Sequence, residues 1–71
     1  MMFAERVRIL RKERGLSQPA VAEQIGLSMR GYQSIELGSP PRYGSIFRIA
    51  EFYDVSVDWL MGRTERREVN R

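Results

Sequence analysis

The stretch from Leu16 to Gly38 constrains the fold most, because it holds two short helical patterns separated by one glycine. The pattern predicts helices over residues 18–24 and 29–37, with Gly26 ending the first. Glycine adopts the left-handed conformation of a tight helix end at little cost, so Gly26 indicates an abrupt change of direction. We therefore expect two short helices packed against each other across a tight turn.

Both helices have clear start signals. Ser17 is placed to cap the first helix, and Pro19 falls in its first turn, where the N–H that proline lacks would have no partner. Leu16 and Val21 have the spacing of a hydrophobic staple, which fixes the angle at which the chain enters this helix. Ser28 can cap the second helix.

The two helices have matching apolar faces. Val21, Ala22 and Ile25 form one face of the first helix, on which Tyr32 and Ile35 of the second can pack. The other side of the second helix is mostly polar and is expected to point outward. The residues on that side are Met29, Arg30, Gln33 and Ser34. An exposed helix face that can form hydrogen bonds is what recognition of base edges in the DNA major groove requires.

Three further helical patterns surround this pair. Phe3, Val7 and Leu10 mark the buried side of an amphipathic helix that precedes it and ends at Gly15. After the pair, a fourth helix ends at Asp54 and a short fifth helix follows. The expected core residues on these last two helices are Ile46, Ile49, Ala50, Tyr53 and Trp59. The fifth helix, which Ser56 caps, also carries Leu60.

These segments together resemble a known family. The segment GLSQPAVAEQIGLSMRGYQSIELG resembles the helix-turn-helix of the lambdoid phage repressor and Cro family, also called the XRE family. FAERVRILRKERGLSQ resembles the first helix of that family, and IFRIAEFYDVSVDWLMG resembles its fourth and fifth helices. The likeness, which covers roughly Phe3 to Gly62, implies an all-α fold. It implies a compact, five-helix, lambda-repressor-like DNA-binding domain over residues 1–62, with the helix-turn-helix at about 18–37.

Residues 63–71 are polar and highly charged, and Val69 is the only apolar residue among them. We expect a flexible tail, because such a segment can bury little apolar surface. In the family that the chain resembles, the domain often passes into a linker at the position of Gly62. The chain is therefore either complete or the N-terminal domain of a longer regulator.

Composition excludes several kinds of site. The chain has no cysteine and no histidine, so it has no disulfide, thiolate zinc site, histidine base or cysteine nucleophile. None of the nine acidic residues clusters with a base, a metal ligand or a glycine-rich phosphate loop. We therefore expect no enzyme activity, no cofactor and no metal. No apolar run is long enough to span a bilayer and there is no signal peptide, so we expect a cytoplasmic protein.

The charge balance fits a nucleic-acid partner. Twelve Lys and Arg residues stand against nine Asp and Glu, which gives a net charge of +3 and a pI near 10.0. The same excess is common in small domains without that function, so the charge alone identifies no partner.

Candidate base-contacting residues lie at the positions that face the major groove in the family that the chain resembles. Arg30 can donate two hydrogen bonds to guanine and Gln33 can pair with adenine, each giving about 1–3 kcal/mol of discrimination. Met29 offers only apolar contact, for instance to a thymine methyl group. The full set is Ser28, Met29, Arg30, Gln33 and Ser34, and the alternative for each is an ordinary exposed helix residue.

Candidate phosphate-contacting residues include Gln18, in the first turn of its helix. Free backbone N–H groups and the positive end of the helix dipole favour a phosphate oxygen there, and the alternative is a solvated surface glutamine. The other candidates are Arg42, Tyr43 and Ser45, after the recognition helix, and Arg11 on the first helix. The family usually has a basic loop after the recognition helix, whereas the loop here is poor in charge, which argues against tight non-specific binding.

Two features concern the recognition helix itself. The resemblance implies a semi-buried ion pair between Arg11 and Glu36, which would join the first helix to the recognition helix. Gly31 lies inside the recognition helix, where glycine costs about 1 kcal/mol relative to alanine. This glycine either permits close approach to DNA or loosens the helix.

One recognition helix reads only a few base pairs among very many competing sites, so we expect a homodimer that reads a palindrome. Candidate interface residues are Phe47, Phe52, Trp59 and Met61, unless these side chains instead cover the small core. The function that we expect is a sequence-specific regulator of transcription that binds double-stranded DNA, acting as a repressor. The alternatives are an antitoxin or immunity-type regulator that also binds a protein partner, and an interaction module that has lost DNA binding.

Overall fold

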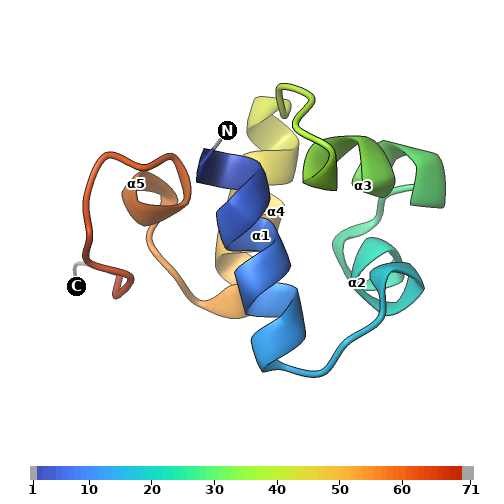
Figure 1. Ribbon diagram of the computed structural model, residues 1–71, viewed down its shortest axis with the longest axis horizontal. Helices are drawn as coiled ribbons and strands as arrows, with labels where there is room; N and C mark the ends of the chain where they lie inside the picture. The colour runs from blue at the N-terminus through green and yellow to red at the C-terminus, as the bar shows by residue number, and fades with distance from the viewer. Residues whose placement is uncertain (1, 70–71) are drawn as a thin grey trace.

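The computed structural model describes residues 2–69, and within that range it contains five α-helices and no strand (Figure 1). The helices are α1 (Met2–Glu13), α2 (Gln18–Ile25), α3 (Met29–Glu36), α4 (Tyr43–Tyr53) and α5 (Val57–Leu60). In the view of Figure 1, α1 lies between α5 on one side and α2 and α3 on the other, while α4 contacts both α2 and α5. The prediction of an all-α fold with five helices is confirmed. Among the described residues, no helix combines the length and the apolar character needed to cross a membrane.

The tight turn between α2 and α3 has the geometry that the sequence predicts. Ser17 Oγ accepts a hydrogen bond from the N–H of Ala20 at 3.2 Å, and Ser28 Oγ accepts one from the N–H of Gly31 at 3.1 Å. Gly26 follows α2 in the left-handed conformation, with φ of +75°. These local contacts define both helix starts and the bend between them.

Other helix ends are close to the predicted positions. α2 extends one residue further than predicted, to Ile25, and α3 ends one residue earlier, at Glu36. α4 ends at Tyr53, where Asp54 takes the left-handed conformation with φ of 54°. Ser56 caps α5 by accepting a backbone hydrogen bond of 3.1 Å.

The hydrophobic core lies where the helices meet, and Val7, Val21, Tyr32, Ile49 and Leu60 are fully buried in it. All of the apolar residues that the sequence pattern assigns to the core are buried, and Val55, just before α5, is buried with them. Because α3 packs on α1 and α2, its position relative to the rest of the molecule is determined by this core.

Residues 63–69, which we call the C-terminal strap, pass along the side of α5 that faces away from α1 in the view of Figure 1. The N–H of Ser56 donates to the carbonyl of Arg67 at 2.7 Å. The Arg67 guanidinium donates to the Glu13 carboxylate at 2.6 and 3.1 Å and lies 4.8 Å from the centre of the Trp59 ring. The structure thus gives this segment specific contacts, and its flexibility in solution stays a prediction.

Candidate nucleic-acid interface

The outer face of α3 presents polar side chains, of which Arg30 and Gln33 are exposed. Ser34 is half-buried beside them, and Ser28 is exposed although its hydroxyl accepts the capping hydrogen bond. Arg30 and Gln33 are three positions apart, so they share one side of the helix. The structure therefore places Arg30 and Gln33, two of the five residues expected to contact bases, on the same accessible surface.

Met29 and Gly31, both on α3, are only partly exposed. Met29 was expected to point outward, but it is half-buried and packs against the hydrophobic core. At Gly31, an added Cβ would lie 3.2 Å from Ser28 Oγ, the atom that caps the helix. Base contact by Met29, and which of its two roles Gly31 has, stay predictions.

Arg11 and Glu36 form an ion pair that joins α1 to the end of α3. Arg11 Nε lies 2.8 Å from Glu36 Oε2, and Nη2 donates to Oε1 at 3.2 Å. The remaining Nη1 donates to the carbonyl of Leu16 at 3.2 Å, and Arg8 Nη1 donates to the backbone carbonyl of Glu36. Each of the three guanidinium nitrogens of Arg11 thus has a partner within the protein, so the phosphate contact also expected of Arg11 would compete with these bonds.

The Glu36 carboxylate has two further donors that sequence reasoning missed. The Tyr32 hydroxyl donates to Oε2, and Gln18 Nε2 donates to Oε1 at 3.0 Å. Tyr32 is one helical turn before Glu36, so the spacing could have indicated this contact, whereas Gln18 reaches Glu36 only through the packing of α2 on α3.

The hydrogen bonds around Glu36 decide its charge state. Burial raises the pKa of Glu36, but the bonds from Arg11, Tyr32 and Gln18 outweigh burial, and the pKa is lowered. Glu36 is 4% exposed and therefore carries a buried, fully hydrogen-bonded negative charge. Burial, together with the bond to Glu36, raises the pKa of Tyr32, so its hydroxyl remains a donor. This cluster fixes α3 on α1 and α2 by polar contacts as well as by the core.

The other residues expected to contact phosphate lie at the start of α4. Arg42 precedes α4 and is exposed, Tyr43 is the first residue of the helix and is 81% exposed, and Ser45 is half-buried. They follow the loop that leaves α3, at the top of Figure 1. Gln18 lies on α2, where its amide is bound to Glu36, and phosphate contact by any of these residues stays a prediction.

The four residues expected at a dimer interface have different surroundings. Phe47 is 58% exposed and Met61 is 39% exposed, so both are accessible to a second copy. Phe52 is half-buried, and its ring meets that of Tyr53 edge-on, with 4.8 Å between the two ring centres. Trp59 is only 6% exposed and belongs to the core, which agrees with its predicted place in the core and leaves little of the ring accessible to a second copy.

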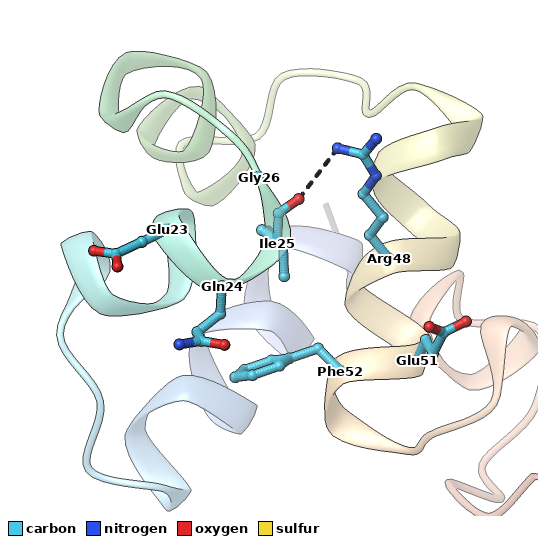
Figure 2. A pocket seen from close by; sticks show the side chains of 7 residues that line it. All are labelled: Glu23, Gln24, Ile25, Gly26, Arg48, Glu51 and Phe52. Atoms are coloured by element: carbon cyan, nitrogen blue, oxygen red, sulfur yellow. Dashed lines mark hydrogen bonds between the residues drawn. The ribbon is translucent and has the colours of Figure 1, made fainter.

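A separate open cleft of about 520 Å³ lies between the end of α2 and α4 (Figure 2). Arg48 crosses it, with Nη1 donating to the carbonyl of Ile25 at 3.3 Å. Its lining residues are Glu23, Gln24, Ile25, Gly26, Arg48, Glu51 and Phe52. None of the residues expected to contact bases lines this cleft, so the cleft is separate from the candidate interface on the exposed face of α3.

The sequence was compared with family models and with known proteins, and both kinds of comparison found matches. A family model described as helix-turn-helix (HTH_3) matches residues 7–60. An uncharacterised HTH-type transcriptional regulator, YqaE of Bacillus subtilis, is 36% identical over 61 residues, which are 84% of this chain and 53% of that protein. The cryptic phage CTXphi transcriptional repressor RstR of Vibrio cholerae is 35% identical over 65 residues, 90% of this chain and 59% of that protein. The chain thus spans somewhat more than half the length of the curated relatives it matches.

A solved structure agrees with these sequence matches. The N-terminal DNA-binding domain of SinR from Bacillus subtilis superimposes with a TM-score of 0.77 at 32% identity, over 84% of this chain and 90% of that domain. The family match covers the whole of α2, α3 and α4 and most of α1. The chain therefore belongs to the HTH_3 family of XRE-type helix-turn-helix proteins.

Proposed function

We propose that this chain is a sequence-specific regulator of transcription, which binds double-stranded DNA by placing α3 in the major groove. The observation that carries the proposal is the pair of exposed side chains, Arg30 and Gln33, on a helix that Glu36 anchors to the protein core. Side chains that read nucleotide bases must be held in position by a rigid part of the protein. The buried ion pair between Arg11 and Glu36 gives α3 this rigidity. The family match and the names of the relatives, one of which is a transcriptional repressor, support the same function.

We further propose that the regulator acts as a homodimeric repressor on a palindromic operator in the cytoplasm. One copy of α3 contacts only a few base pairs, and two copies related by a two-fold axis double the length of sequence that is read. A repressor of this kind blocks a promoter by occupying it, so the proposal includes no catalytic step.

Selection of bound duplexes from a random pool tests both parts. We expect enrichment of an inverted repeat, with log affinity falling by about 0.9 for each unit of log salt per phosphate neutralised. Arg30→Ala should reduce the preference at one base pair in each half-site by about 5-fold or more. Arg66→Ala, which removes an exposed arginine of the strap, is the control and should leave the preference unchanged.

Two results would contradict the proposal. Absence of enrichment by a folded protein would exclude sequence-specific binding and favour the function with a protein partner. Enrichment of a single, non-repeated site would leave DNA reading in place but exclude the palindrome.

A further inference from the structure

A line of hydrogen bonds connects the buried charge of Glu36 to the exposed face of α3. Gln18 Nε2 donates to Glu36 Oε1 at 3.0 Å, and Gln33 Nε2 donates to Gln18 Oε1 at 3.4 Å. Glu36 is 4% exposed, Gln18 is half-buried and Gln33 is exposed. The line therefore runs from the interior to the surface at which bases would be read.

The chemistry of Glu36 dictates the direction of every bond in this line. An ionised carboxylate only accepts hydrogen bonds, and Glu36 already accepts from Arg11 and Tyr32. The end of the Gln18 amide that faces Glu36 must therefore be its NH₂ group, which turns its carbonyl oxygen away from the carboxylate. A carbonyl oxygen only accepts, so the end of the Gln33 amide that faces Gln18 must be its NH₂ group as well.

This orientation leaves a defined pattern at the outer end of Gln33. Its carbonyl oxygen and its second N–H are free to meet a base. Adenine presents a donor and an acceptor, N6–H and N7, in the major groove, and this pair matches one oxygen and one N–H. Guanine presents two acceptors there, N7 and O6, so the carbonyl oxygen of Gln33 would face an acceptor.

From these contacts we propose that Gln18 is a positioning residue, which transmits the fixed orientation of Glu36 to the amide of Gln33 and thereby makes Gln33 selective for adenine. The inference rests on the proposed function, because it concerns the same reading surface. It differs from a phosphate contact by Gln18 in what it controls, namely the choice of base rather than the overall affinity.

The test compares Gln18→Met with Gln33→Met and with the double variant. Methionine has nearly the same length as glutamine and forms none of the amide hydrogen bonds. Affinities are measured for the selected operator and for operators in which the adenine that depends on Gln33 is replaced by guanine. We expect Gln18→Met to lower the preference for adenine by about 5-fold or more, and to have no such effect once Gln33 is methionine. Gln24→Met, an exposed glutamine on the same helix and outside the line, is the control.

Two outcomes would overturn the inference. An equal loss of affinity on both operators in Gln18→Met would assign Gln18 to a phosphate contact. If Gln18→Met still lowers the preference for adenine when Gln33 is methionine, the role of Gln18 is independent of Gln33. Thermal unfolding of each variant identifies a general loss of fold. Gln33→Met is the second variant where Gln18→Met fails to fold, because the donors to Glu36 are Arg11, Tyr32 and Gln18 rather than Gln33.

A measurement on the free protein separates this inference from the proposed function. The order parameter of the Gln33 side-chain NH₂ group, from NMR relaxation, should be high in the native chain and should fall in Gln18→Met, while that of Gln24 stays the same. A Gln33 side chain that is equally mobile in both proteins would exclude the positioning role whether or not an operator is found. If the chain selects no operator, the proposed function fails and this measurement still decides the arrangement of the two amides.

Discussion

At the scale of single residues, Arg11 carries the largest stability effect that we expect from one substitution. Arg11→Met keeps most of the side-chain length but leaves the Glu36 carboxylate buried without its counter-charge. Removing one partner of a buried ion pair typically costs about 3–5 kcal/mol, a large share of the stability of a domain of this size. Urea denaturation at pH 7 measures the change.

The control for this prediction is Lys12→Met, at the exposed neighbouring position on α1. It removes the same charge and should change the free energy of unfolding by no more than about 0.5 kcal/mol. Equal effects of the two substitutions would show that the Arg11–Glu36 pair contributes no more than a surface charge.

The lowered pKa of Glu36 makes stability depend on pH in a predictable direction. Its pKa in the folded protein is below the ordinary value of 4.5, so the charged form stabilises the fold above pH 4.5. This contribution is lost as the pH falls from 4.5 through the lower folded pKa. Glu36→Gln removes the titrating group, and the stability difference between the native chain and this variant should therefore shrink in that range.

Urea denaturation of both proteins between pH 7 and pH 3 checks this prediction. The pKa of Glu13 is also lowered, because Arg67 donates a hydrogen bond to it, so protonation of Glu13 at low pH also reduces the stability. Only the difference between the two proteins therefore isolates Glu36. A difference that stays constant down to pH 3 would contradict the prediction.

The residues around Glu36 also show what sequence reasoning can and cannot supply. The pairing of Arg11 with Glu36 was available only through the family resemblance, since 25 positions separate them. The Tyr32 contact follows from spacing within one helix, but an apolar stripe explains the same residue equally well. The Gln18 contact depends on how α2 crosses α3, which a one-dimensional pattern does not contain.

At the scale of elements, the helices were predictable because their signals are local. Ser17, Gly26 and Ser28 each act on a neighbouring turn, so the pattern places the ends of α2 and the start of α3 to within one residue. The strap was not predictable in this way. Its contact between Arg67 and Glu13 joins positions 54 apart, and its polar composition alone indicates a solvated tail.

The strap leads to a prediction about Trp59, whose ring is in contact with two guanidinium groups. Arg6 lies 4.6 Å from the ring centre on α1, and Arg67 lies 4.8 Å from it on the strap. Arg67→Ala should lower the free energy of unfolding by about 1 kcal/mol through the lost cation–π contact, since the exposed pair with Glu13 adds little. Tryptophan emission should shift to longer wavelength as the ring becomes accessible to water.

Arg66→Ala is the matched control for the strap, because Arg66 is the exposed neighbour of Arg67. It should leave both the stability and the emission spectrum unchanged. If the two alanine variants behave alike, the strap is not docked in solution and the prediction of a flexible tail is correct.

At the scale of the whole molecule, the dimensions of the domain set the geometry of a dimer. The domain measures 31 × 22 × 19 Å, and successive major grooves on one face of DNA are about 34 Å apart. Two copies side by side on one face of the duplex can therefore meet near the two-fold axis while each inserts α3. Phe47, the more exposed of the two accessible candidate residues, is where we expect them to touch.

Phe47→Gln tests this arrangement without changing the charge of the protein. An exposed aromatic residue at the centre of an interface commonly contributes more than 1 kcal/mol, so operator affinity should fall by about 5-fold or more. Sedimentation equilibrium on operator DNA should show one bound copy at protein concentrations where the native chain binds as two. Ile9→Gln, which removes a side chain of comparable exposure on α1, should leave both quantities unchanged. If the Phe47→Gln variant still binds operator DNA as two copies with native affinity, Phe47 does not lie at the interface and Met61 remains as the exposed candidate. If the native chain binds a selected operator as a single copy, the dimer itself is excluded.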